Sequence, residues 1–184
     1  MYRIMLVDDE PNILSALKRV LATIPVDTLD GEKPEIETFT STDEALIRAS
    51  SIPVDLVISD YRMPGMNGIE FLSRVIAYQP NIARLILSGN ADLDAVVEAI
   101  NKLQIFRFIT KPWHDFELKS SISQALAARA LAVENQQLAD VVRVQNDRLK
   151  RHEAELQRLE TESPGITKLK RSADGGILIE DDDY

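Results

Sequence analysis

The sequence has no cysteine and no long apolar run, and its charge is unbalanced towards the negative side. The absence of cysteine excludes disulfide bonds and thiolate chemistry, and it fits a cytoplasmic protein. No run approaches the roughly 18 apolar residues that a membrane span requires, so we expect no membrane partner. The net charge of −9 argues against a general DNA binder, which needs clustered Lys and Arg to neutralise phosphates.

Short apolar stretches alternate with amphipathic ones through the first 125 residues. Strand-like runs end at Val7, Phe39, Asp60, Ser88 and Thr110. Between them, apolar residues recur every three or four positions, which is typical of helices that cover a sheet. This βαβαβαβαβα order predicts an α/β fold with a five-stranded, parallel, doubly wound sheet and helices on both faces.

Two helix starts are marked by local signals. Ser41 stands three residues before Glu44, the spacing of a capping box, and predicts a helix that continues to about Ser50. Asn67 with Glu70 three residues later predicts the start of another helix, ending near Gln79. A further helix is expected from about residue 91 to residue 100.

Polar side chains follow four of the expected strands. Asp8 and Asp9 end the first strand, Asp60 the third, Ser88 the fourth and Lys111 the fifth. Taken alone, the two aspartates would indicate a helix cap and the serine a turn. Ligands of open parallel sheets bind at the carboxyl ends of the strands, however, where these five side chains would meet. Three carboxylates, a hydroxyl and a lysine together indicate a metal-assisted phosphoryl site.

This set of residues resembles the receiver domain of bacterial two-component response regulators, which has a flavodoxin-like fold. The resemblance covers residues 1 to about 125 and rests on Asp8-Asp9, Asp60, the run Met63-Pro64-Gly65-Met66-Asn67-Gly68, Ser88 and Lys111-Pro112. It implies that Asp60 accepts a phosphoryl group from a histidine kinase or a phosphotransfer protein. A carboxylate nucleophile of this kind forms an aspartyl phosphate.

The resemblance also implies a magnesium ion. Asp9 and Asp60 would bind Mg²⁺ directly, Asp8 through water, and Arg62 through its backbone carbonyl. Lys111 would place a fixed positive charge beside a phosphate oxygen.

A conformational switch is implied at the same site. Ser88 would hydrogen-bond the phosphoryl group, and the aromatic ring of Phe108 would swing inward in response. Judged without the resemblance, Phe108 would be an ordinary core residue. The peptide bond between Lys111 and Pro112 is expected to be cis, by analogy with the family.

The second part of the sequence differs in composition, since residues 115–160 contain neither Pro nor Gly. Such a stretch predicts one long helix, and a heptad register fits from Ala128 onwards. Seven of the ten a and d positions are apolar, which is enough for a modest coiled coil. The predicted dimer seam consists of Leu131, Asn135, Leu138, Val142, Leu149, Leu156 and Leu159. The alternatives are an antiparallel coil and a helix that folds back on the receiver.

Residues 163–184 read as a small β-hairpin around Ser172-Ala173-Asp174-Gly175-Gly176, followed by an acidic tail. The expected organisation is therefore a phosphoacceptor receiver domain (1–125), a coiled-coil helix continuous with its last helix (126–162), and a terminal hairpin and tail (163–184).

The favoured function is that of a response regulator that signals through a coiled-coil dimer and contacts with an unknown downstream protein. We expect it neither to bind DNA nor to be an enzyme, because no helix-turn-helix or effector domain follows the coil. Two alternatives remain open. The chain could be the N-terminal part of a longer regulator with an effector such as a cyclic-dinucleotide phosphodiesterase, or a scaffold receiver that is not phosphorylated.

Overall fold

A computed structural model describes residues 1–25, 31, 33–89 and 103–163 of the chain. Its five strands form one parallel sheet in the order β2-β1-β3-β4-β5. This confirms the predicted doubly wound, flavodoxin-like sheet, in which the first strand lies between the second and the third. The strands are β1 (Arg3–Val7), β2 (Glu35–Phe39), β3 (Leu56–Asp60), β4 (Ala83–Ser88) and β5 (Arg107–Thr110).

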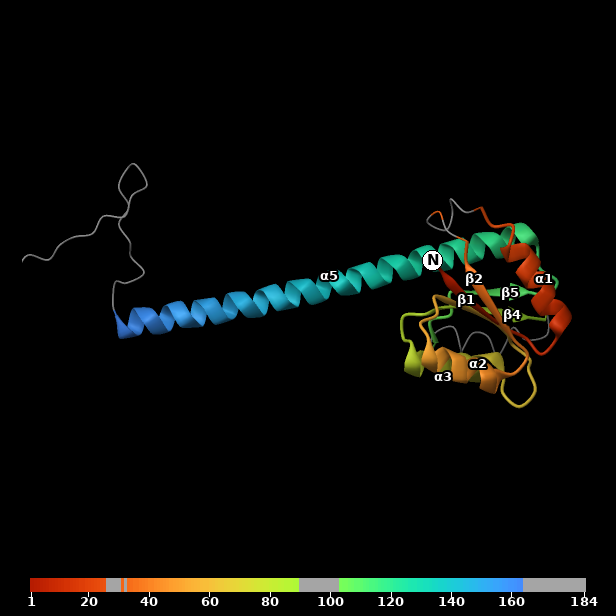
Figure 1. Ribbon diagram of the computed structural model, residues 1–184, viewed down its shortest axis with the longest axis horizontal. Coiled ribbons are helices and arrows are strands. Elements are labelled where there is room, and N and C mark those ends of the chain that lie inside the picture. The colour runs from red at the N-terminus through yellow and green to blue at the C-terminus, as the bar shows by residue number, and fades with distance from the viewer. Residues whose placement is uncertain (26–30, 32, 90–102, 164–184) are drawn as a thin grey trace, which may run out of the picture. The chain divides into compact units, whose positions relative to one another are not determined.

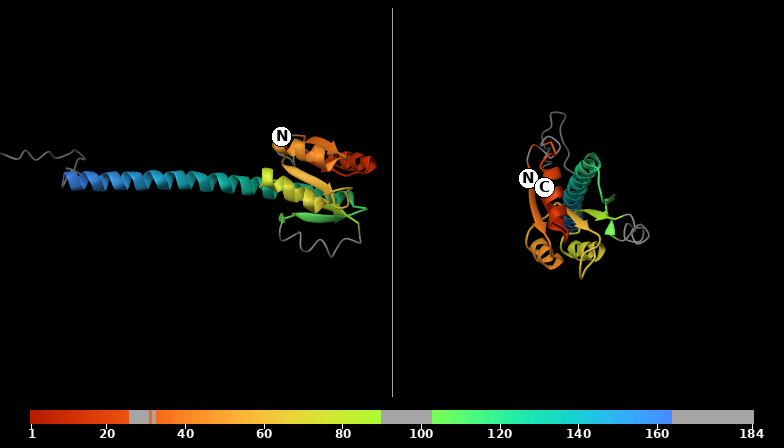
Figure 2. Two further views of the ribbon diagram at one scale, coloured as in Figure 1. Left: turned by 90° about the horizontal axis from the view of Figure 1, so that it is seen from below. Right: turned by 90° about the vertical axis from the view of Figure 1, so that its right-hand side faces the viewer.

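Helices cover both faces of the sheet, as Figures 1 and 2 show. On one face, α1 (Pro11–Leu21) and the first part of α5 (Asp115–Glu162) pack against Ile4 and Leu6 of β1. On the other face, α2 (Thr42–Ser51) and α3 (Gly68–Tyr78) pack against Met5 and Val7. Successive strand residues therefore serve two cores, which explains why the central strands are apolar throughout rather than alternating.

The helix starts lie where the local signals placed them. The Ser41 hydroxyl accepts a hydrogen bond from the Glu44 amide at the start of α2, and the Asn67 side chain accepts one from the Glu70 amide at the start of α3. α1 begins at Pro11, which needs no hydrogen-bond acceptor at that position. The apolar run of the fifth strand starts at Ile105 in the sequence, but strand β5 begins two residues later, at Arg107.

Side chains also join the amino ends of the strands. The Asp55 carboxylate, just before β3, accepts a hydrogen bond from the Arg3 amide at 2.7 Å and forms an ion pair with Arg129 of α5, also at 2.7 Å. The side-chain amide of Gln79 donates to the carbonyls of Ala49 and Ile52 and accepts from the Val54 amide. These contacts hold α3 and α5 to the edge of the sheet opposite the carboxyl ends.

The chain divides into two compact units, Met1–Glu134 and Asn135–Tyr184. The first extends beyond the predicted receiver boundary at 125, because α5 keeps contact with the sheet edge as far as Arg129. In the second unit, residues 135–162 are helical as the remainder of α5, which confirms the long helix. Within the part of the chain described here, no helix is long and apolar enough to cross a membrane.

Two predicted elements cannot be compared with the structure. The helix expected at residues 91–100 and the hairpin and tail after Ser163 lie outside the described residues. Residues 26–30 and 32, in the loop between α1 and β2, lie outside them as well.

Candidate functional site

Three of the predicted site residues converge at the carboxyl ends of β1, β3 and β5. The Lys111 ammonium lies 2.7 Å from Oδ2 of Asp8 and 2.5 Å from Oδ1 of Asp60. Both carboxylates are largely buried, and residues more than fifty positions apart in the chain thus share one cation. The parallel order of the sheet produces this meeting, because β1 lies beside β3 and β5 follows β4 on the same side.

Backbone groups fix the two carboxylates. The Arg62 amide donates to the second oxygen of Asp60 at 2.9 Å, and the Glu10 amide donates to the second oxygen of Asp8 at the same distance. Each aspartate therefore closes a turn two residues long at the end of its strand. Oδ1 of Asp60 and Oδ2 of Asp8 remain directed at Lys111.

The turn after Asp60 depends on a glycine. The Gly68 amide donates to the Tyr61 carbonyl, and a Cβ atom at residue 68 would overlap the carbonyl oxygen of Asp60. The Ser59 hydroxyl donates to the same Asp60 oxygen at 2.9 Å. The start of α3 is thus packed directly under the backbone of the candidate phosphoacceptor.

The site carries more negative than positive charge. Burial raises the pKa of Asp8, and Lys111 opposes that rise only in part. Burial also disfavours the charged form of Lys111, but hydrogen bonds to Asp60 and Asp8 outweigh it and hold the pKa of the lysine above its ordinary value. One ammonium between two carboxylates leaves an excess of negative charge that a further cation would relieve.

The donor set fits magnesium. Mg²⁺ requires only one or two protein carboxylates, since water and phosphate oxygens complete its shell. Asp8 and Asp60 already lie together, whereas Asp9 is exposed at the start of the following loop. Among the residues that the structure describes, no three or more His, Cys, Asp or Glu side chains are close enough together to hold a metal ion. The carboxylate of Asp9 therefore does not join those of Asp8 and Asp60 in this structure.

The two residues predicted to form a switch, Ser88 and Phe108, lie on neighbouring strands beside this cluster. Ser88 ends β4 with 3% of its surface exposed, and its carbonyl accepts a hydrogen bond from the Lys111 amide at 2.8 Å. Phe108 is paired with Ile86 in the β4–β5 register and packs partly buried against the core on the α2 and α3 face. The bond between Lys111 and Pro112 is cis, as the resemblance implied.

Sequence reasoning missed the double ion pair of the lysine. The sequence predicted that Lys111 would contact an oxygen of the bound phosphoryl group. In the structure, the ammonium forms ion pairs with both Asp8 and Asp60. No local pattern in the sequence signals such a pair, because it forms only when three strands are assembled. The one sequence feature that could have indicated these ion pairs is that the five residues include three carboxylates and a single cation.

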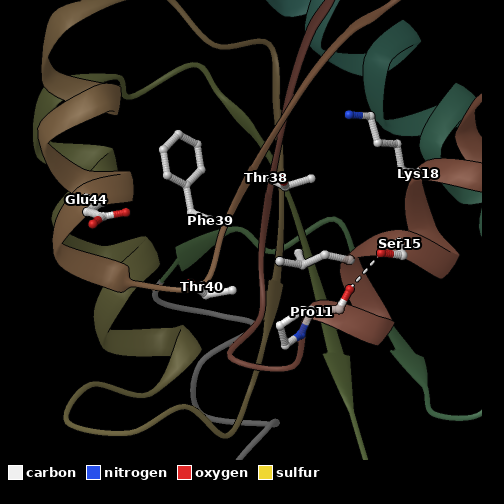
Figure 3. A pocket seen from close by; sticks show the side chains of 8 residues that line it. Pro11, Ser15, Lys18, Thr38, Phe39, Thr40 and Glu44 are labelled. Carbon is white, nitrogen blue, oxygen red and sulfur yellow. Dashed lines mark hydrogen bonds between the residues drawn. The ribbon is translucent and has the colours of Figure 1, made fainter.

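A separate hollow of about 330 Å³ lies between α1 and the end of β2, as Figure 3 shows. Pro11, Ser15 and Lys18 line it from α1, with Thr38 and Thr40 opposite. Its only hydrogen bond among the residues drawn runs from the Ser15 hydroxyl to the Pro11 carbonyl. None of the strand-end aspartates lines this hollow, so we do not assign the phosphoryl chemistry to it.

Comparison with known proteins gives a consistent result. The response regulator receiver domain family matches residues 4–123. The chain is 35% identical over 128 residues to the hydrogenase transcriptional regulatory protein HoxA of Cupriavidus necator, covering 70% of this chain and 25% of that protein. It is 31% identical to the DNA-binding transcriptional regulator NtrC of Salmonella typhimurium, covering 67% of this chain and 24% of NtrC.

Solved structures show the same likeness. A protein from Neptuniibacter caesariensis is 41% identical, with a TM-score of 0.64, covering 73% of this chain and 93% of that one. The signal receiver domain of an HD domain-containing protein from Pseudomonas fluorescens is 32% identical, with a TM-score of 0.62, covering 70% and 97%. The chain spans about a quarter of the length of the curated relatives. From its first strand to the start of its long helix, this chain belongs to the response regulator receiver domain family.

Proposed function

We propose that Asp60 is the phosphoacceptor of a two-component signalling pathway. The observation that carries this proposal is the ion pair of 2.5 Å between Asp60 and Lys111, on a carboxylate whose other oxygen accepts a hydrogen bond from the Arg62 amide. A histidine kinase or phosphotransfer protein supplies the phosphoryl group. The P–N bond of its phosphohistidine breaks while a bond forms between phosphorus and a carboxylate oxygen of Asp60.

Residues around Asp60 favour this transfer by position and charge. The transition state spreads negative charge over three equatorial oxygens, which Lys111 can meet by moving from the carboxylates to the phosphoryl group. Asp9, Asp60 and the Arg62 carbonyl would hold Mg²⁺ directly, and Asp8 would hold it through water. The ion supplies positive charge that screens the incoming phosphate from the carboxylates.

Ser88 and Phe108 are proposed to report the phosphorylated state. Ser88 lies on the strand next to Asp60, because its neighbour Leu87 is paired with Asp60 in the β3–β4 register. A hydrogen bond from its hydroxyl to the phosphoryl group would draw the end of β4 inward. Phe108 lies partly buried on the adjacent strand, where a shift of β4 would change its packing.

The output is proposed to be a coiled-coil homodimer that contacts a downstream protein. Among the described residues nothing covers most of the predicted seam: Leu138, Val142 and Leu149 are each more than half exposed, as are Leu131 and Leu156. A second copy of the same helix matches this stripe, because a heptad repeat is self-complementary. Asn135, at an a position, would fix the register of the pair.

Intact-mass analysis of the full chain tests the phosphoacceptor. The protein is incubated with acetyl phosphate, with Mg²⁺ or with a chelator, beside the variant Asp60→Asn. We expect one phosphoryl group on the wild type, little without Mg²⁺ and none on the variant. The same gain of mass on Asp60→Asn would refute the assignment, and no gain on either protein, even with a cognate kinase, would favour a scaffold receiver.

The second candidate is the N-terminal regulatory part of a longer regulator. Two observations favour it. This chain spans only about a quarter of the length of HoxA and of NtrC, and one similar structure is the receiver of an HD domain-containing protein. An effector such as a cyclic-dinucleotide phosphodiesterase would then follow the helix. Reading the gene beyond the codon for Tyr184 decides between the two, since a stop codon there excludes the longer protein.

A further inference from the structure

A buried arginine lies at the amino end of β4, away from the aspartyl site. Arg84 has 7% of its surface exposed, and among the described residues no carboxylate forms an ion pair with it. Its two terminal nitrogens donate to the carbonyls of Pro80 and Gln104 at 3.3 and 3.4 Å, beyond the usual range for N–H···O bonds. Burial lowers the pKa of Arg84. Within the described part of the chain, the guanidinium therefore has no counter-ion.

A second arginine borders the same place. Arg129 of α5 forms an ion pair with Asp55, but its Nε atom is buried without a hydrogen-bond partner in the described part of the chain. The Nε atom of Arg84 is in the same condition. Among the described residues, Asp55 is the carboxylate that pairs with a guanidinium group here, and it pairs with Arg129, so Arg84 is left without one.

Both arginines line a cavity of about 170 Å³. Its remaining walls include Gln104, the ring of Phe106 and the small side chains of Ala128 and Ala132. Gln104 adopts a left-handed conformation, with φ of 48°, that residues with a side chain rarely take. This conformation accompanies the weak contact between its carbonyl and Arg84, and such conformations gather at ligand sites.

We propose that this cavity binds a small organic carboxylate. Its charged end is held by Arg84 and Arg129, and its apolar end lies against Phe106 and the alanines of α5. An arginine fork matches a carboxylate in shape as well as charge. The long bonds to Pro80 and Gln104 allow a small rotation of the Arg84 guanidinium, which exchanges neutral acceptors for a charged one.

Equilibrium dialysis of the full chain against radiolabelled butyrate, at constant ionic strength, tests the site. Acetate, phosphate and chloride serve as competitors. We expect saturable binding of one butyrate per chain, with acetate a weaker competitor and the inorganic anions weaker still. Arg84→Gln and Arg129→Gln should each weaken binding about tenfold or more, because each removes a hydrogen bond to a charged group.

Two further variants separate this site from general effects of charge or folding. Ala132→Leu adds bulk to a residue that lines the cavity without changing the charge, and it should weaken binding as strongly as the arginine variants. Arg107→Gln removes an exposed arginine whose side chain contacts Ser121 and should leave binding unchanged. No saturable binding, equal displacement by phosphate or chloride, or unchanged affinity in folded Ala132→Leu protein would overturn the proposal.

Discussion

The receiver unit and the helical segment at 135–162 contain similar apolar side chains in different surroundings. Leu72 and Ile86 in the receiver have none of their surface exposed, whereas Leu138 and Leu149 in the helix are 57% and 59% exposed. In the receiver, strands and helices far apart in the chain cover one another. In the described part of the helical segment no other element covers the apolar stripe, which is why we propose a partner for the helix.

The largest expected effect comes from the receiver core. Phe71→Ala should lower the free energy of unfolding of the receiver by about 3–5 kcal/mol, because the ring is fully buried. Phe116→Ala, at a ring that is 85% exposed, is the matched control and should change it by less than about 0.5 kcal/mol. Urea denaturation followed by circular dichroism measures both, and similar losses would contradict the assigned core.

Next in size is the effect on the proposed dimer. Val142 and Val144 are equally exposed, at 53%, but only Val142 occupies a predicted seam position. Val142→Lys should weaken the dimer about a hundredfold, because two ammonium groups would meet in the seam. Sedimentation equilibrium should show Val144→Lys associating like the wild type.

The same pair of variants tests whether a dimer seam exists. If both proteins associate as tightly as the wild type, the heptad stripe is not the seam. Phosphorylation of Asp60 in either variant should proceed as in the wild type, since neither residue belongs to the receiver unit.

A smaller effect is expected at Gly68, which packs under the proposed phosphoacceptor Asp60. Gly68→Ala should cost about 1–3 kcal/mol of stability and slow phosphorylation, because its new methyl group would displace the Asp60 carbonyl. Gly65→Asn is the control: residue 65 has φ of 79°, which asparagine tolerates, and open space around it. Rates of phosphorylation by acetyl phosphate compare the two, and equal rates would show that the close packing at Gly68 is not needed.

The smallest effect concerns an ion pair on the receiver surface. The hydrogen bond from Arg48 holds the pKa of Glu37 below its ordinary value of 4.5. A carboxylate with a lowered folded pKa stabilises the fold above its unfolded pKa, and that contribution is lost as the pH falls through the folded value. Glu37→Gln should therefore lower Tm slightly at pH 7 and not at strongly acidic pH. Glu134→Gln in α5 is the control and should not lower Tm at either pH. A pH-independent loss would contradict the role of the charge.

The fold was largely predictable because its signals are local. Strand runs, the caps at Ser41 and Asn67, and the proline-free helix each depend on neighbouring residues in the chain. The order of the strands then follows from the known handedness of parallel crossovers. The start of β5 was less predictable, because Ile105 and Phe106 are as apolar as the strand itself.

The candidate site was predicted as a set of residues and not as a network. Asp8, Asp60, Ser88 and Lys111 all lie at strand ends where the sequence placed them. The double ion pair of Lys111 and the ion pair between Arg129 and Asp55 were not foreseen. Each joins residues separated by many positions, and such contacts leave no periodic signal in the sequence.

The most direct test of the account is to locate the phosphoryl group itself. Borohydride reduces an aspartyl phosphate to homoserine, so phosphorylated full-length protein can be reduced, digested and mapped by mass spectrometry. We predict homoserine at residue 60 alone, and none when Mg²⁺ is chelated before phosphorylation. Homoserine at Asp8, Asp9 or another aspartate in place of residue 60 would contradict the central claim.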